Sequence, residues 1–186
     1  MRVLAIAGSL RADSHNARLL REAARVAPAG TEVIVWPGLR EVPPYDADMD
    51  VTPAPEGVAA MRDAIWEADA LLIATPEYNA SIPGVLKNAI DWASRPWPDN
   101  PLRGKPTTVL SASEGSFGAV WAQAELKKVL GIAGARVMDE GLALPRAHEA
   151  FDPDGRLVEP VYRESLAATL EALVDQVRER AIASAA

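Results

Sequence analysis

The sequence predicts an α/β protein: a three-layer sandwich in which helices cover both faces of a five-stranded parallel sheet. Short, continuously apolar runs recur along the chain, as expected of strands buried on both faces. Segments with apolar residues at helical spacing separate these runs, and such alternation favours parallel pairing through right-handed crossovers. The 186 residues suit a single domain over 1–186, with strand order 2-1-3-4-5.

The first half of the chain supplies three strands and three helices. Strands are expected at 3–7 (VLAIA), at 32–36 (EVIVW, closed by Pro37 and Gly38) and at 70–74 (ALLIA). Helices are expected at 17–26, at 56–67 and at 83–94, where Pro83 is tolerated in the first turn. A loop with five prolines spans 37–55.

The second half completes the pattern. Strands are expected at 107–111 (TTVLS) and 135–138, and helices at 116–130 and 160–183. The segments 95–106 and 145–159 are expected to be loops, the first rich in proline and the second polar and irregular. Ligands of such sheets bind beyond the carboxyl ends of the strands, which selects the loops 8–16, 75–82 and 111–118.

Composition excludes several functions. The chain has no cysteine, so disulfides, zinc–thiolate sites, iron–sulfur clusters and a cysteine nucleophile are all impossible. A formal net charge of −7 argues against nucleic acid as a partner. No apolar run reaches the roughly 18 residues that a membrane span needs, and the N-terminal run suits a buried strand better than a signal peptide. We therefore expect a cytoplasmic protein with neither a membrane nor a nucleic-acid partner.

Hydrogen-bonding side chains gather in the turn between the first strand and the first helix. They are Ser9, Arg11, Ser14, His15 and Asn16. A helix N-terminus offers free N–H groups and partial positive charge, so these residue types suit a phosphate monoester. The alternative is ordinary capping by Ser14 with Arg11 in solvent. The turn lacks the GxxxxGK[ST] and GxGxxG patterns, which argues against a P-loop NTPase and a dinucleotide-type Rossmann site.

The turn after the third strand contains Pro76, Glu77, Tyr78 and Asn79. Tyr78 offers an aromatic wall, while Asn79 and neighbouring backbone N–H groups offer directed donors. This combination suits a flat heteroaromatic ring with carbonyls on one edge, such as a flavin. From residue types alone, a purely structural turn remains the simpler alternative.

Three segments together resemble the NAD(P)H-dependent FMN reductase family. They are GSLRADSHN at 8–16, PEYNASIPGVLKNAIDW at 76–92 and SASEGSFGA at 111–119. The family is a flavodoxin-like group that includes quinone and chromate reductases and azoreductase-like enzymes. In the third segment, Gly118-Ala119 stands where the family usually has two glycines. The resemblance implies FMN as cofactor and NADPH or NADH as co-substrate.

The resemblance also implies which residues bind FMN. Around the phosphate they are Ser9, Arg11, Ser14, His15 and Asn16. Along the isoalloxazine ring they are Pro76, Glu77, Tyr78 and Asn79. Beside the ribityl chain and ring they are Ser113, Glu114, Gly115 and Gly118. No catalytic side chain is predicted, because flavin itself carries the chemistry. No metal site is predicted either: Asp46, Asp48 and Asp50 lack the remaining features of an EF-hand, and a solvated loop is favoured.

The expected reaction takes hydride from NAD(P)H and passes electrons, in the same cleft and by a ping-pong mechanism, to a small acceptor. Quinones, chromate, azo compounds, nitro compounds and free flavin all remain open as acceptors. A flavodoxin-like electron carrier without efficient NAD(P)H turnover is the alternative, and a domain that has lost its ligand is a third. The resemblance implies a homodimer or homotetramer. Trp92, Trp97 and Trp121 are candidates for that interface or for the core.

Overall fold

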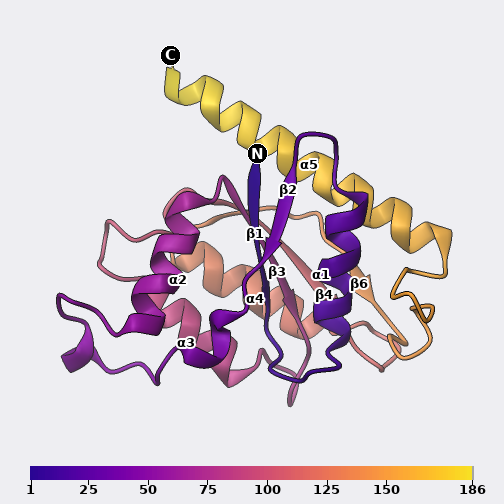
Figure 1. Ribbon diagram of the computed structural model, residues 1–186, viewed down its shortest axis with the longest axis horizontal. Coiled ribbons are helices and arrows are strands. Elements are labelled where there is room, and N and C mark those ends of the chain that lie inside the picture. Colours follow the sequence, from indigo (N-terminus) through magenta and orange to yellow (C-terminus); the bar gives the residue numbers. More distant parts are fainter. Residues whose placement is uncertain (186) are drawn as a thin grey trace.

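The computed structural model describes the backbone of residues 1–185 and the side chains of residues 1–180 and 182 (Figure 1). A parallel sheet forms the middle layer, in the order β2-β1-β3-β4-β5, so the predicted order is confirmed. Its strands are β1 (Arg2–Ala7), β2 (Glu32–Val35), β3 (Ala70–Thr75), β4 (Pro106–Ala112), β5 (Arg136–Val137) and β6 (Ala143–Leu144). The helices are α1 (His15–Val26), α2 (Glu56–Glu67), α3 (Gly84–Ala93), α4 (Val120–Ile132) and α5 (Pro160–Ala185), with 3₁₀ turns η1 (Gly38–Glu41) and η2 (Ala47–Met49).

The strand β6 was not predicted from the sequence. It pairs with the carboxyl end of β4, whereas β5 pairs with its beginning. The register differs by two residues between the two pairings: Pro106 faces Arg136, but Ser111 faces Ala143. β5 and β6 are therefore two parts of one interrupted edge strand, and two-residue runs are too short to show a strand pattern.

Alternating strand residues build a core on each face of the sheet. Leu4, Ile6 and Ile73 point to the side covered by α2, α3 and α4, where Trp92 is also fully buried. Val3, Ala5 and Leu72 point to the side covered by α1 and α5. This two-sided burial explains why the strands are continuously apolar in sequence. Within the described chain, no helix is both long and apolar enough to cross a membrane.

The proline-rich loop after β2 is fixed to α2 and α3 by polar contacts. Asn88 donates to the Pro43 carbonyl at 2.8 Å and accepts from the Tyr45 N–H at 2.7 Å. Trp92 donates its indole N–H to the same Pro43 carbonyl at 2.9 Å. Two of the three acidic side chains considered for a cation have protein partners: Asp46 accepts from the Asp48 N–H, and Asp50 pairs with Arg62 at 2.9 Å.

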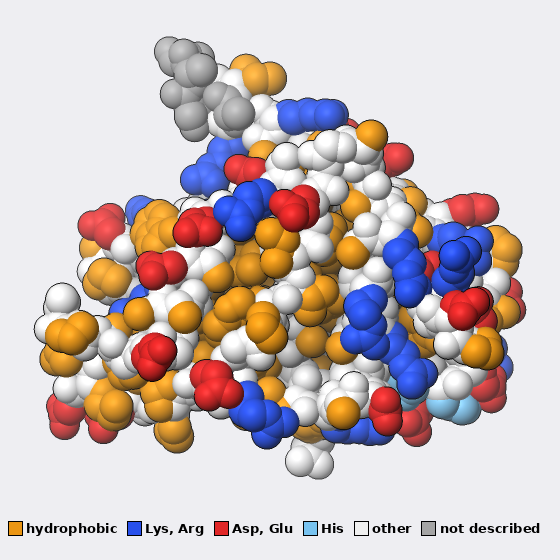
Figure 2. Space-filling view, in the orientation of Figure 1, with side chains coloured by type: hydrophobic (Ala, Val, Ile, Leu, Met, Phe, Trp, Pro, Cys, Tyr) orange, Lys and Arg blue, Asp and Glu red, His pale blue; other side chains and the backbone are white. Residues whose placement is uncertain are grey.

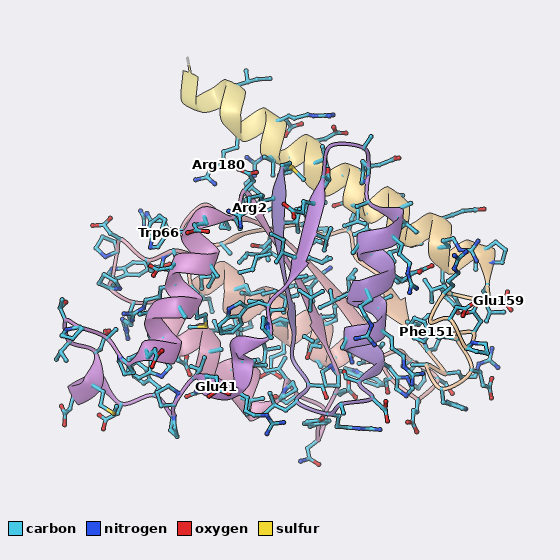
Figure 3. The ribbon with its side chains drawn as sticks, in the orientation of Figure 1. Arg2, Glu41, Trp66, Phe151, Glu159 and Arg180 are labelled. Carbon is cyan, nitrogen blue, oxygen red and sulfur yellow. The ribbon has the colours of Figure 1, made fainter. Side chains whose placement is uncertain are left out.

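A buried glutamate joins α1, α5 and the irregular segment 145–159. Glu22 on α1 is 2% exposed. Its carboxylate accepts from Arg25 at 3.2 Å and from the Leu157 N–H at 3.3 Å, and it lies 3.8 Å from Arg163 on α5. Phe151 of the same segment, labelled in Figure 3, forms an isolated antiparallel bridge with Leu157. The segment has no helix or strand longer than an isolated bridge, and the Glu22 carboxylate is one of the points at which it is attached to the helices.

A buried lysine lies at the end of the sheet where the parallel strands begin, opposite the edge at which α1 starts. Lys105 precedes β4 and donates to the Ala68 carbonyl at 2.6 Å, just beyond the end of α2. Figure 3 places Trp66 and Arg180 at this end of the molecule. Burial lowers the pKa of the Lys105 ammonium; nearby Arg180 adds to the lowering, and Asp69 opposes it.

We expect this lysine to make stability rise with pH in the alkaline range. The unfolded chain binds the Lys105 proton more tightly than the folded chain, so unfolding becomes less favourable as pH rises from the lowered folded pKa toward the ordinary 10.5. Urea titrations across this range should show the gain in the wild type and not in Lys105→Met. Exposed Lys128 gives the matched control: Lys128→Met should keep the wild-type slope.

Candidate functional site

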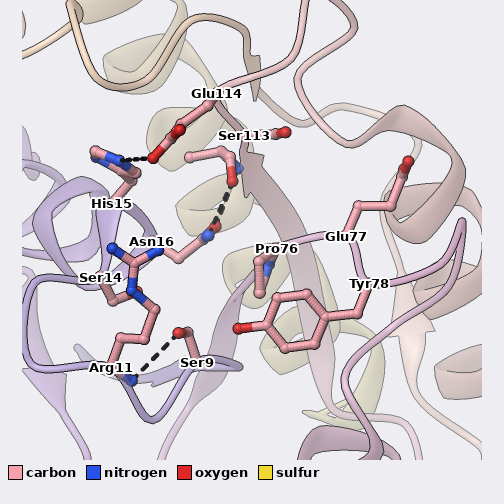
Figure 4. Close-up of a pocket in the computed structure, with 11 residues that line it drawn as sticks. Ser9, Arg11, Ser14, His15, Asn16, Pro76, Glu77, Tyr78, Ser113 and Glu114 are labelled. Carbon is pink, nitrogen blue, oxygen red and sulfur yellow. Dashed lines mark hydrogen bonds and ion pairs between the residues drawn. The ribbon is translucent and has the colours of Figure 1, made fainter.

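A cleft of about 240 Å³ opens at the carboxyl ends of the strands (Figure 4). Three loops form it, after β1, β3 and β4, at the edge that parallel α/β sheets use for ligands. Its lining residues are Ser9, Arg11, Ser14, His15, Asn16, Pro76, Glu77, Tyr78, Ala112, Ser113 and Glu114. The structure thus brings together every predicted site residue except Asn79, Gly115 and Gly118.

The loop after β1 combines a helix cap with a free cation. Ser14 is the N-cap of α1, and its hydroxyl accepts from the Ala17 N–H at 3.2 Å. The capping alternative is therefore true of Ser14. The Arg11 guanidinium is exposed at the cleft and has no hydrogen-bond or ion-pair partner among the described side chains. Arg40 secures the loop from outside by donating to the Leu10 carbonyl at 2.9 Å.

The start of α1 keeps two backbone donors for a ligand. The N–H groups of His15 and Asn16 have no acceptor within the described part of the chain. They stand at the positive end of the helix dipole. The Ser9 hydroxyl, which accepts from the Arg11 N–H at 3.3 Å, also lines the cleft. Together with Arg11, this group of donors can bind a phosphate dianion.

Asn16 has a structural role that its residue type alone did not predict. Its side chain is 2% exposed and bonds twice with Ala112 at the end of β4. The amide NH₂ donates to the Ala112 carbonyl, and the amide oxygen accepts the Ala112 N–H, both at 3.0 Å. The Asn16 side chain therefore fixes the first loop to the third, and among its polar groups only the backbone N–H has no partner in the described chain.

His15 also connects the first loop with the third. Its Nε2 lies 3.3 Å from a Glu114 carboxylate oxygen, across the upper side of the cleft in Figure 4. The Glu114 side chain is 61% exposed, so this pair is open to water and contributes little stability by itself. Its position makes it a bridge over the region between the two loops.

The loop after β3 makes a tight turn that presents Tyr78. Tyr78 and Ser81 exchange backbone hydrogen bonds at 2.9 and 3.1 Å. The two residues between them, Asn79 and Ala80, have positive φ values of 53° and 60°, as a type I′ turn requires. Figure 4 shows the Tyr78 ring directed across the cleft toward Ser9. Asn79 is exposed at the turn and lies outside the cleft lining.

Replacing Ala80 with glycine should stabilise the protein. Ala80 is exposed, so glycine removes the cost of a left-handed alanine without losing buried surface. We expect the free energy of unfolding to rise by about 0.5–1 kcal/mol in chemical denaturation. Ala29 is also an exposed turn residue, but its φ is negative. Ala29→Gly should lower stability slightly, and a gain at both positions would contradict this account.

Glu77 stabilises the wall of the cleft rather than pointing into it. Its carboxylate accepts from the Ala122 N–H in the first turn of α4 at 3.2 Å. No side chain at the N-cap of α4 provides this bond, because Ala119 occupies that position. A carboxylate at a helix N-terminus is favourable with the helix dipole. The loop after β3 is thereby attached to α4.

The loop after β4 passes through two left-handed residues before α4 begins. Gly118 and Ala119 have φ values of 60° and 65°, so α4 starts at Val120 and not at 116 as predicted. A Cβ at Gly118 would lie 2.9 Å from the backbone of β6, which makes glycine necessary there. Ala119 adopts the left-handed conformation that glycine would favour, so the backbone of a glycine pair is retained. The Ser113 hydroxyl accepts from the Gly115 N–H at 3.1 Å.

The donors and walls of the cleft fit FMN. One end offers an unpaired guanidinium, a hydroxyl and two free helix N–H groups for a phosphate. The other end offers Pro76 and the half-exposed Tyr78 ring for a flat aromatic system. Ala112 also lines the cleft and was not predicted, because a small apolar residue gives no chemical signal in sequence. Within the described residues, no cluster of three or more His, Asp or Glu side chains could hold a metal ion.

Comparisons with known proteins agree with this geometry. The family described as NADPH-dependent FMN reductase matches residues 1–149. A NAD(P)H-dependent FMN reductase of Pseudomonas aeruginosa is 42% identical over 179 residues, covering 96% of each chain. A 2-hydroxy-1,4-benzoquinone reductase of a Burkholderia species is 34% identical over 183 residues, covering 98% of this chain and 99% of that protein. The solved structure of FerB, a flavoenzyme NAD(P)H:(acceptor) oxidoreductase from Paracoccus denitrificans, superposes with a TM-score of 0.87 at 37% identity, covering 96% of this chain and 97% of that one.

Proposed function

Because this chain belongs to the NADPH-dependent FMN reductase family, we propose that it is an oxidoreductase that uses FMN to move electrons from NADPH or NADH to a small acceptor. The observation that carries the proposal is the convergence of three separate loops on one cleft with an anion site at one end and an aromatic wall at the other. The flavodoxin-like arrangement of the sheet supports it.

The residues at the start of α1 would hold the FMN phosphate. Arg11 supplies a charged fork, Ser9 a hydroxyl, and His15 and Asn16 their backbone N–H groups. Ser14 and the Asn16 amide act indirectly, since their hydrogen bonds hold the loop in this shape. The bridge between His15 and Glu114 would lie along the ribityl chain.

The loops after β3 and β4 would hold the ring. Pro76 and Tyr78 provide apolar contact, and Glu77 keeps the turn attached to α4. When bound, FMN supplies the two-electron and one-electron chemistry of the reaction. The protein residues would orient it, and the cleft is open to solvent at the wall formed by Tyr78, which is 47% exposed. No side chain needs to act as an acid or base, and we assign none.

We propose that donor and acceptor use this open side in turn, which predicts ping-pong kinetics. Quinones are the acceptor class we favour, because the Burkholderia relative is named for reduction of a hydroxylated benzoquinone. A flat, uncharged quinone suits a cleft whose exposed wall is an aromatic ring. Chromate, azo compounds, nitro compounds and free flavin are further acceptors for the same panel.

The test is flavin uptake followed by reduction. Purified protein should bind FMN stoichiometrically and should bleach at the flavin absorbance maximum when mixed with NADPH or NADH under nitrogen. It should then recover its colour on addition of 1,4-benzoquinone. Flavin uptake without bleaching on the turnover timescale would instead indicate an electron carrier. Absence of flavin uptake would indicate a domain without this ligand.

We also propose that the protein works as a homodimer or homotetramer in the cytoplasm. Trp97 and Trp121 are 62% and 53% exposed, so both are available for a contact between copies. Trp92 is not available, since it is fully buried and hydrogen-bonded within the core. Phe117 is 64% exposed beside Trp121, with ring centroids 5.2 Å apart, and extends the same apolar surface. Light scattering at several concentrations would give the oligomeric state.

A further inference from the structure

One arginine near the cleft has a strained backbone and a side chain without a polar partner among the described residues. Arg146 has a φ of +46°, a left-handed conformation that is uncommon and costly for a residue with a long side chain. Its side chain is exposed and makes no hydrogen bond or ion pair with any side chain or carbonyl that the structure describes. Within the described residues this guanidinium forms no polar contact that would offset the backbone strain, so it is available to a group outside the chain.

Backbone hydrogen bonds hold Arg146 against the third loop of the cleft. The Arg146 N–H donates to the Gly115 carbonyl at 3.2 Å. On either side, Ala147 N–H donates to the Ser113 carbonyl at 3.0 Å, and Ser113 N–H donates to the Leu144 carbonyl at 3.1 Å. Ser113 lines the cleft. The unpartnered guanidinium is thus carried on a rigid piece of backbone at the edge of the site.

The positive charge of Arg146 matters because few basic side chains lie at the cleft. The chain has a net charge of −7, and the largely exposed carboxylate of Glu114 lines the cleft. Arg11 is the only arginine or lysine among the cleft-lining residues described, and the proposed FMN phosphate uses it. Figure 2 shows basic side chains gathered over the region of α1. Arg18, Arg21 and Arg25 of that helix line a separate hollow and do not line the cleft.

The reduced dinucleotide that must enter this cleft carries a pyrophosphate, and NADPH carries one further phosphate. We infer that Arg146 binds the phosphate groups of the nicotinamide dinucleotide and so raises the affinity of the enzyme for its electron donor. The inference rests on the proposed function. The neighbouring His148 does not provide the same charge, since its Nε2 lies 3.1 Å from the Glu149 carboxylate.

The experiment compares hydride donors with and without phosphate. Arg146→Gln should raise the KM for NADPH about tenfold at low ionic strength, as expected for loss of one charge-assisted contact. The KM for NADH, which carries one phosphate fewer, should rise less. The KM for 1-benzyl-1,4-dihydronicotinamide, which carries no phosphate, should not change. Arg146→Lys should recover part of the affinity, and the dissociation constant of NADP⁺, measured by calorimetry, should rise with the KM in Arg146→Gln.

Two further variants separate recognition from folding. Arg146→Gly removes the left-handed strain, so its Tm should rise by about 2–4 °C while its affinity for NADP⁺ falls. A residue kept for structure would not show opposite changes in stability and affinity. Arg156 is exposed and unpaired within the described side chains but lies outside the cleft, so Arg156→Gln should match the wild type in both measurements.

An unchanged KM for NADPH in Arg146→Gln, or an equal loss with the benzyl donor, would overturn the inference. If the wild type takes up FMN and oxidises NADPH, and Arg146→Gln has the wild-type KM, the inference is wrong but the proposed function is still supported. Wild-type protein that neither binds FMN nor oxidises NADPH would contradict the proposed function itself.

Discussion

Arg11→Ala should weaken FMN binding about 10- to 100-fold and leave the fold intact. The Arg11 guanidinium has no partner within the described chain, so its removal breaks no internal contact. A charge-assisted hydrogen bond to a phosphate contributes roughly 1.5–3 kcal/mol, which corresponds to that loss of affinity. The dissociation constant of FMN, measured by quenching of flavin fluorescence, should rise accordingly, while the Tm of the flavin-free protein stays the same.

Arg21 on α1, the helix that follows the loop of Arg11, provides a matched control. Arg21 is also exposed, but it points from α1 outside the cleft lining. Arg21→Ala should bind FMN as the wild type does, at both low and high salt. Riboflavin provides the second control, because it lacks the phosphate: Arg11→Ala and wild type should bind it equally. Unchanged FMN affinity in Arg11→Ala would remove this side chain from the phosphate site.

The largest loss of stability is expected from Glu22→Ala. This buried carboxylate accepts hydrogen bonds from Arg25 and the Leu157 N–H and forms an ion pair with Arg163. Removing it leaves a buried donor unpaired and two arginines without their counter-ion. Both arginines are about half-exposed and regain water, so we expect a decrease of about 2–4 kcal/mol rather than the full cost of a buried pair.

Two further variants test whether the loss of stability comes from the loss of the Glu22 carboxylate charge. Glu22→Gln keeps an oxygen for the Leu157 N–H and should lose about half as much as Glu22→Ala in urea denaturation. Glu164 on α5 is exposed and has no partner within the described chain, so Glu164→Ala should stay within about 0.5 kcal/mol of the wild type. Equal losses in Glu22→Ala and Glu164→Ala would mean that the buried network does not stabilise the fold.

The fold was predictable because burial leaves a strong trace in sequence. The runs VLAIA and ALLIA are apolar throughout since both faces of β1 and β3 are covered. The order 2-1-3-4-5 was predicted because five strands alternating with helices in a chain of this length suit it, and it is confirmed. β6 left no such trace, because only two of its residues pair with β4. The start of α4 was placed four residues early, because helical spacing does not reveal the left-handed backbone of Gly118 and Ala119.

The position of the cleft was predictable from the sequence, but the hydrogen bonds that its side chains make within the protein were not. Topology alone brings the ends of β1, β3 and β4 to one edge, so the three loops could be selected in advance. Residue types do not tell which polar groups are already used inside the protein. From sequence, the side chains of Asn16 and Glu77 were expected to bind the ligand. In the structure they form hydrogen bonds with the backbone of Ala112 and Ala122. Arg146 carried no motif, and only its backbone angle and contacts distinguish it.

The internal use of those polar groups has a consequence for how the cofactor comes and goes. Ser14, Asn16 and Glu77 hold the three loops in place through bonds that need no ligand. An incoming molecule would therefore lose its own freedom but would not have to order the protein as well, which favours fast association. Apart from the His15 and Asn16 N–H groups, which would gain an acceptor, the amides of the three loops should exchange nearly as slowly before flavin is added as after. Flavin-free protein should refill without a folding step.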